Sequence, residues 1–379
     1  MTYRDKALAI VAIIGSVIAM TTAPAQAASF DAMPSFNGIV FAVAYSGRTT
    51  FVGGDFTAAI VNGKPVARRH LAAIDAGTGA LLPWAPGADG RVKALTVSGS
   101  SVYVAGDFSM IGSHQRDSLA RLDAGSGAVS STFKHSISGR PYAMAAADGR
   151  LYLGGAFTAV DGQARGKLAA FKLSTGALDT KWKPVVDDQV EAIASGAGRV
   201  YVGGRFHKIN SIGGYDRLAA LDPYSAALVP AFKPKPPVIT YAISVTSSGV
   251  FSAHGGQGGK INAYTLAGAS RWSATFDGDA RAVAVLGDTV YAGGHFDRAC
   301  RTPRTGPHGV CIDGSDARIK LAALDAGAGT LTSWSADANG VEGVFGLAAS
   351  ASLGAIAAGG AFTTIDGQSQ KRFAQFSGA

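Results

Sequence analysis

The stretch Val200-Tyr-Val-Gly-Gly-Arg-Phe206 combines a short β-branched and aromatic run with two glycines and a phenylalanine. Valine and tyrosine favour extended strands, whereas paired glycines permit a tight turn and close backbone approach. The pattern recurs along the chain. Its copies are Phe51–Phe56, Val102–Phe108, Leu151–Phe157, Val200–Phe206, Val290–Phe296 and Ile356–Phe362, with a decayed copy at Val250–Gly256.

The spacing of the copies predicts the fold. Phe108, Phe157 and Phe206 are 49 residues apart, and each copy is flanked by further strand-like segments, as at 190–194 and 218–222. A last segment in most units ends in a bulky aromatic residue such as Trp182. Repeats of this length with four short strands are typical of propeller blades. We therefore expect an all-β, seven-bladed β-propeller with four-stranded blades.

The two ends of the chain predict how the ring closes. The seventh unit ends with Phe373-Ala-Gln-Phe376 and has no room for a fourth strand of its own. Phe30-Asp-Ala-Met-Pro-Ser-Phe36 precedes the first unit and carries an aromatic residue and a proline where other units carry theirs. We expect residues 29–37 to pair with Phe373–Phe376 as the missing outer strand, which would remove an exposed sheet edge.

The N-terminus has the features of a secretory signal peptide. Arg4 and Lys6 precede an apolar run over 7–20, and Ala25-Gln-Ala27 provides a small-x-small cleavage pattern. We predict a signal peptide over 1–27 and a single propeller domain over 28–379, secreted and in some settings associated with the cell wall. The alternative is a membrane anchor, but the apolar run is shorter than a spanning helix needs, so we expect no stable membrane insertion.

Cys300 and Cys311 are the two cysteines of the chain. They lie in one polar, proline-containing stretch, and export to an oxidising compartment favours a disulfide between them. The scattered histidines lack the spacing of a metal site. We expect a local disulfide, no metal and no cofactor.

The chain carries 34 basic and 26 acidic side chains and a formal net charge of +8. Such a charge favours anionic partners such as cell-wall or glycan polymers, although it is also compatible with ordinary surface charge. A protein partner is the other possibility. No basic run or recognised motif indicates nucleic acid, and we expect a monomer.

Variable positions within the repeat are the candidate binding residues. The residue between Gly-Gly and Phe differs among units and is a candidate for a ring of ligand contacts on one face; the alternative is an unconstrained turn position. The charged or polar members of this set are Asp55, Asp107, Arg205 and His295.

Units five and six differ most from the pattern and adjoin one another. Unit five has a cropped loop over 255–260, whereas unit six carries the Cys300–Cys311 insertion. A short loop beside a basic one predicts a pocket for an anionic group, because arginine makes bidentate contacts to anions. The alternative is neutral loop drift held in check by the disulfide. The residues proposed for this pocket are Arg298, Arg301, Arg304 and His308, and His254 and Lys260 are further candidate binding residues.

No catalytic motif is present: the sequence has neither a His-Glu-x-x-His helix nor a Gly-x-Ser-x-Gly elbow. Propeller enzymes gather residues from several blades, so a lyase or a glycan-active hydrolase at the central channel stays as the alternative function. Its candidate residues are Asp55, Asp107, Arg205, His254 and His295.

Three motifs carry a family resemblance: Val200–Phe206, then Arg217-Leu-Ala-Ala-Leu-Asp222, and Leu178-Asp-Thr-Lys-Trp182. Together they resemble the delta-60 type β-propeller repeat, and the likeness covers nearly the whole mature chain. The resemblance implies a secreted or surface-associated propeller of bacterial type. We expect such a protein to bind or scaffold a cell-surface polymer or a protein through its loop-rich face, since the fold itself does not fix the function.

Overall fold

The computed structural model describes residues 26–256 and 258–378. Within these ranges the chain is built from β-strands, and the one helical segment is a 3-10 turn, η1 (Pro307–Gly309). The all-β prediction is confirmed. The predicted signal peptide lies almost wholly outside the described residues. No helix in the described part is both long and apolar enough to cross a bilayer.

Each copy of the repeat forms an antiparallel hairpin, and in five of the seven described hairpins the second strand carries the glycine pair. The first strands are β3 (Val40–Ser46), β8 (Arg91–Ser98), β13 (Ile137–Ala147), β17 (Val190–Gly196), β22 (Thr240–Thr246), β26 (Ala280–Leu286) and β32 (Val344–Ser350). The second strands are β4 (Thr49–Gly54), β9 (Ser101–Asp107), β14 (Arg150–Val160), β18 (Arg199–Gly204), β23 (Gly249–His254), β27 (Thr289–Gly294) and β33 (Ala355–Gly360).

A third strand pairs with the other edge of each second strand. The second strand is therefore central in its sheet and almost completely buried, as the continuous apolar runs require. The third strands are β7 (Leu71–Asp75), β12 (Leu119–Asp123), β16 (Leu168–Lys172), β21 (Leu218–Leu221), β24 (Lys260–Tyr264), β30 (Leu321–Asp325) and β36 (Phe373–Ser377).

The fourth strand differs from the sequence expectation. Among the described residues, only β25 (Ser270–Thr275) pairs along its length with a third strand, and it belongs to the unit with the decayed repeat. In five other units the corresponding segment makes a single bridge, such as Ile74 with Leu81. The aromatic residue of the segment is buried against the next sheet, where the Trp84 indole Nε1 donates to the Asp123 carbonyl at 3.0 Å.

Short hairpins extend from the loops that follow the second strands. They are formed by β5 (Ala58–Val61), β6 (Lys64–Ala67), β10 (Met110–Ile111), β11 (His114–Gln115), β15 (Gln163–Ala164), β19 (Lys208–Ile209), β20 (Ile212–Gly213), β28 (Arg298–Cys300), β29 (Ser315–Ala317), β34 (Thr364–Ile365) and β35 (Gln368–Ser369). β15 pairs with the extended end of β14 rather than with a separate strand.

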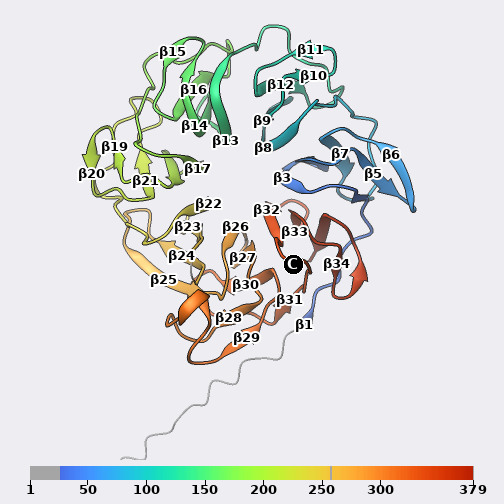
Figure 1. Ribbon diagram of the computed structural model, residues 1–379, viewed down its shortest axis with the longest axis vertical. Helices are drawn as coiled ribbons and strands as arrows, with labels where there is room; N and C mark the ends of the chain where they lie inside the picture. The colour runs from blue at the N-terminus through green and yellow to red at the C-terminus, as the bar shows by residue number, and fades with distance from the viewer. Residues whose placement is uncertain (1–25, 257, 379) are drawn as a thin grey trace, which may run out of the picture.

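The sheets surround a common centre, with the first strands nearest to it and the short hairpins on the periphery (Figure 1). Neighbouring sheets pack closely because the first glycine of the pair leaves room for the next sheet. A Cβ on Gly53 would lie 2.7 Å from the Val92 Cγ1 atom, and a Cβ on Gly359 would lie 2.4 Å from the Val40 Cγ1 atom. The second contact joins the last sheet to the first.

Residues 26–37, where the described part of the chain begins, lie beside the last sheet but form no continuous ladder with it (Figure 1). β1 (Gln26–Ala27) pairs in parallel with β31 (Trp334–Ser335), and β2 (Ser35–Phe36) pairs with β5. The predicted strand pairing between 29–37 and Phe373–Phe376 is thus reduced to individual contacts. The Asp31 amide donates to the Gln375 carbonyl at 2.7 Å, and the Phe36 amide donates to the Lys371 carbonyl at 3.1 Å.

Candidate functional site

Every first strand contains a β-bulge near its start. The pairing with the second strand skips one residue there, for example between Val40 and Ala42. A bulge re-aims the side chain of the extra residue, and bulges are frequent beside functional sites. The skipped residues, all partly exposed, are Phe41, Lys93, Tyr142, Glu191, Tyr241, Arg281 and Phe345.

Six of these bulge residues line one cavity of about 410 Å³. It is bordered by Phe41, Lys93, Glu191, Arg205, Tyr241, Arg281 and Phe345. Tyr142, the remaining bulge residue, lies beside Lys93, whose Nζ is 5.0 Å from the centre of the tyrosine ring.

A second cavity of about 550 Å³ shares Phe41, Arg281 and Phe345 with the first. Its lining residues are Ile39, Phe41, Asp55, Arg91, Arg281, His295, Val341, Glu342 and Phe345. We refer to these two adjoining cavities together as the central cavity. It opens on the face where first strands begin and second strands end, which we call the loop face. The turns that join each first strand to its second strand lie on the opposite face, which we call the turn face.

Most cations of the central cavity are paired with carboxylates. Lys93 Nζ lies 2.8 Å from Asp107 Oδ2, and an Arg281 terminal nitrogen lies 3.3 Å from Asp279 Oδ2. Arg205 Nε lies 3.1 Å from Glu191 Oε1. Burial alone would lower the pKa of Arg205, but the hydrogen bond and charge of Glu191 outweigh it and raise that pKa above its ordinary value.

Aromatic rings form another part of the cavity wall. The rings of Phe41 and Phe345 pack edge to face, with centroids 5.5 Å apart. The Arg281 guanidinium lies 5.4 Å from the Phe345 ring centre and 5.9 Å from that of Tyr241. Burial, followed by the charge of Asp279, raises the pKa of the Tyr241 hydroxyl, so this hydroxyl stays protonated at neutral pH and can donate a hydrogen bond.

Two polar atoms of the cavity residues are buried without a hydrogen-bond partner among the described residues. They are Asp55 Oδ1, an acceptor, and Arg281 Nε, a donor. Buried polar atoms are paired in most native structures. Both residues line the cavity, but these two atoms have almost no accessible surface, so a ligand would contact other atoms of the same carboxylate and guanidinium groups.

The structure brings three of the sequence-predicted residues to the central cavity. Asp55 and His295 line its second part, and Arg205 lines its first part. Asp107 contacts it through the ion pair with Lys93 and borders a separate cavity of about 460 Å³ with Arg140. The residue between Gly-Gly and Phe thus lies on the loop face in these four units.

His254 is a correction to the sequence-based list. Its side chain has no exposed surface, and its ring nitrogens lie 3.2 Å from Thr240 Oγ1 and 2.8 Å from Ser252 Oγ. Burial lowers its pKa to about 3. His254 occupies the position of the second glycine in other units, and it acts as a neutral core residue. Lys260 is half-buried and donates to Thr275 Oγ1 at 3.1 Å.

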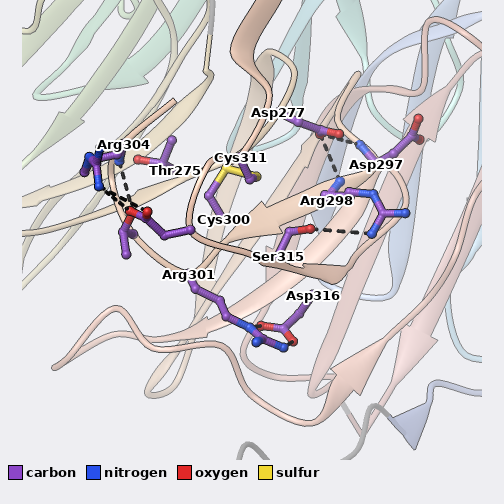
Figure 2. The surroundings of a disulfide bond; sticks show 12 residues. Thr275, Asp277, Asp297, Arg298, Cys300, Arg301, Arg304, Cys311, Ser315 and Asp316 are labelled. Atoms are coloured by element: carbon purple, nitrogen blue, oxygen red, sulfur yellow. Dashed lines mark hydrogen bonds and ion pairs between the residues drawn. A yellow bond between two sulfur atoms is a disulfide. The ribbon is translucent and has the colours of Figure 1, made fainter. Parts of the chain in front are cut away.

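The Cys300–Cys311 disulfide is present, as predicted. It joins Cys300, the last residue of β28, to Cys311 in the loop between β28 and β29, and Figure 2 shows it among several arginines. Arg301 pairs with Asp316 at 3.0 Å, and Arg304 pairs with Asp313 at 3.1 Å.

The predicted anion pocket between units five and six is not formed from these side chains. Arg298 contacts Ser315 Oγ at 3.5 Å, and exposed His308 lies within η1. The insertion does pack on the cropped loop, since a Cβ on Gly258 would lie 3.0 Å from Thr305 Cγ2. However, its arginines lie outside the central cavity, and two of them are neutralised within the insertion itself.

Sequence reasoning missed the bulge residues. They vary from aromatic to acidic to basic, so no motif includes them. A signal was nevertheless present: in four units the residue follows the first buried valine of the first strand, at Val40, Val92, Val190 and Val344. Over residues 26–256 and 258–378, no group of three metal-ligating side chains is close enough to hold a metal ion.

Comparison with known proteins supports the fold. Residues 146–180 match the model of a family described as a domain of unknown function (DUF5122) beta-propeller. A search of curated proteins finds no match. Among solved structures, the WD40 β-propeller domain of Doa1 is similar with a TM-score of 0.59 and 9% identity, covering 94% of this chain and 96% of that one.

The computationally designed Ika8 protein is also similar, with a TM-score of 0.50 and 15% identity over 94% of this chain and 100% of that one. Identities this low show the fold alone. The chain is therefore an all-β protein with a β-propeller fold.

Proposed function

We propose that this chain is an exported, seven-bladed β-propeller of the delta-60 repeat type that binds a cell-surface polymer outside the cell. The central cavity on the loop face is its binding site. The observation that carries the proposal is the repeated bulge, which presents one side chain from each first strand near the centre. The resulting wall mixes aromatic, acidic and basic groups, as ligand sites commonly do.

The blade number is supported by the order of contacts between first strands. β3 contacts β8, and the contacts continue through β13, β17, β22 and β26 to β32, which contacts β3 again. Each of these strands begins one copy of the repeat. A ring of seven blades accounts for this closed order, with an incomplete fourth strand in most blades.

Closure by the N-terminus is supported by an equivalence of hydrogen bonds. In the first, second and sixth units an outer-segment amide, that of Leu82, Ser130 or Thr332, donates to the carbonyl of the middle residue of the third strand. The Asp31 amide makes the same bond to Gln375, the middle residue of β36. The N-terminal segment thus takes the place of an outer segment in the last blade.

A second equivalence concerns packing on the next blade. A Cβ on Gly127 would lie 3.3 Å from the Trp84 indole Nε1 atom, and a Cβ on Gly79 would lie 3.6 Å from Met33 Sδ. Met33 therefore covers the turn of the first blade as Trp84 covers that of the second. The N-terminal segment belongs to the last blade by hydrogen bonding and contacts the first by packing.

Export is supported by the signal-peptide pattern at 1–27 and by the disulfide. A disulfide persists in an oxidising compartment. It also rigidifies the longest insertion on the loop face, where an extracellular protein would be exposed to proteases.

The proposal is tested by binding of the mature chain, residues 28–379, to surface polymers. Wild type and a Tyr241→Ala variant would be incubated with insoluble cell-wall material and with immobilised soluble polysaccharides, and bound protein would be quantified. Tyr224→Ala is the matched control, because Tyr224 is 57% exposed and follows the third strand on the turn face.

We expect wild type and Tyr224→Ala to bind equally and Tyr241→Ala to bind at least about tenfold more weakly, because loss of a cavity-lining aromatic residue removes both packing and a hydroxyl donor. No binding to any surface polymer would refute the proposal, as would equal binding by the Tyr241 variant.

A further inference from the structure

We infer that the central cavity binds an uncharged saccharide unit, through the paired action of Asp55 and Arg281 and the aromatic wall of Phe41 and Phe345. This inference rests on the proposed function and specifies the chemistry of its ligand. It departs from the expectation that the overall basic charge selects an anionic polymer.

The local charge does not favour an anion. Four cationic side chains line the cavity, but three of them, Lys93, Arg205 and Arg281, are in ion pairs. Asp55 and Glu342 add further negative charge to the wall. An anionic ligand would have to displace carboxylates that already hold the cations, at a cost that desolvation increases. A neutral ligand can leave these ion pairs intact.

The cavity wall offers a ligand both an acceptor and a donor. The Asp55 carboxylate can accept a hydrogen bond, and the Arg281 guanidinium can donate one. A hydroxyl group both donates and accepts. By contrast, a carboxylate or phosphate could accept from Arg281 but would be repelled by Asp55. Both residues line the second part of the cavity, so neighbouring hydroxyls of one sugar ring could satisfy them together.

The aromatic wall suits the apolar faces of a sugar ring. Phe41 and Phe345 are half-buried and pack edge to face, which leaves part of each ring accessible from the cavity. Aromatic rings present large apolar contact area with little loss of conformational freedom. Cavities of about 410 and 550 Å³ fall within the usual range for small-molecule sites, so a short oligosaccharide segment would fit.

The test is calorimetric titration of the mature chain with neutral oligosaccharides, such as glucan and mannan fragments, and with uronic-acid oligosaccharides of the same length. The variants are Asp55→Asn, Arg281→Met and Phe345→Leu. Arg48→Met is the control, because Arg48 lies in a hairpin turn on the turn face and its side chain is 66% exposed. Circular dichroism and thermal unfolding establish that each variant is folded.

We expect a neutral oligosaccharide to bind with little dependence on salt between about 50 and about 500 mM, because no net charge is neutralised. Each cavity variant should weaken binding about tenfold or more, and Arg48→Met should leave it unchanged. Asp55→Asn is the most specific variant because it keeps the shape and removes the charge.

Tighter, salt-sensitive binding of the uronic-acid ligands that is lost in the Arg281 variant would overturn the inference and leave the proposed function standing. Neutral binding that survives all three substitutions would also overturn it. If the chain binds no saccharide and no surface polymer, both the inference and the proposed function fail.

Discussion

Replacing Phe36 by alanine tests whether the N-terminal segment closes the ring. Phe36 is fully buried, its ring centre lies 4.4 Å from that of Phe56 in the first sheet, and it lies 6.2 Å from that of Phe373 in the last sheet. Phe276 occupies the same place after the outer strand of unit five, where it is fully buried and its ring centre lies 4.2 Å from that of Phe296 in unit six. Phe276→Ala is therefore a matched substitution at a place where no chain terminus is involved.

The expected cost follows from burial. A buried phenylalanine removes about 150 Å² of apolar surface from water, which at about 25 cal/mol/Å² corresponds to about 4 kcal/mol. Measured substitutions of buried phenylalanine by alanine cost about 3–5 kcal/mol. If the N-terminal segment is an integral outer segment of the last blade, Phe36→Ala and Phe276→Ala should lower the free energy of unfolding by similar amounts in this range.

Urea unfolding followed by tryptophan fluorescence measures both variants against wild type. A Phe36→Ala variant within about 1 kcal/mol of wild type, beside a Phe276→Ala variant that loses the full amount, would refute closure by this segment. A chain that begins at Asn37 provides a second measurement, and we expect it to be at least as unstable as Phe36→Ala.

Three further outcomes follow from particular residues. Because the pKa of His254 falls from an ordinary 6.5 to about 3 on folding, protons bind the unfolded chain first, so stability is complete above pH 6.5 and is lost as the pH falls toward 3. In wild type this histidine should make the free energy of unfolding fall by about 1.4 kcal/mol per pH unit between pH 6.5 and 3, and His254→Gln should abolish that contribution. Urea unfolding at several pH values measures it, and a variant with the same pH dependence as wild type would contradict a buried, neutral His254. Gly359→Ala should lower the free energy of unfolding by about 1–3 kcal/mol, because a Cβ at this position has no space. Gly213→Ala, where a Cβ meets open space, should stay within about 0.5 kcal/mol of wild type. Equal urea midpoints for the two variants would contradict the packing argument. Replacing Cys300 and Cys311 by serine should destabilise by roughly 3 kcal/mol or less without changing saccharide affinity, and a loss of affinity would assign the insertion a role in binding.

The repeat was readable from the sequence because six of the seven units keep the second glycine of the pair. A Cβ on Gly54 would lie 2.1 Å from the Ile39 carbonyl oxygen, and one on Gly204 would lie 2.1 Å from the Gln189 carbonyl oxygen. A position with so little room for a side chain gives a clear period, which His254 interrupts in the fifth unit. The all-β composition and the position of the disulfide followed from equally local rules.

Other features depend on contacts that the sequence does not display. The outer segments were predicted as strands, but their aromatic residues are buried against the next sheet and most pair at one position only, as Leu221 does with Leu228. His254 resembled a reactive residue in a decayed repeat, yet its hydrogen bonds to Thr240 and Ser252 make it part of the core. The basic insertion suggested an anion site because it looks unbalanced in sequence. Its acidic partners, such as Asp316, which pairs with Arg301, lie beyond Cys311 in the sequence.

If the central cavity is a binding site as proposed, the bulges separate the residues that contact a ligand from those that hold the fold. Ladder pairing continues on both sides of each skipped residue, as it does around Glu191 between Val190 and Ala192, and the side chain of that residue faces the cavity instead of the core. Selection or design can therefore exchange these side chains singly, with little penalty to the scaffold. A library randomised at such positions would sample many specificities on one backbone, much as antibody loops do on a constant framework.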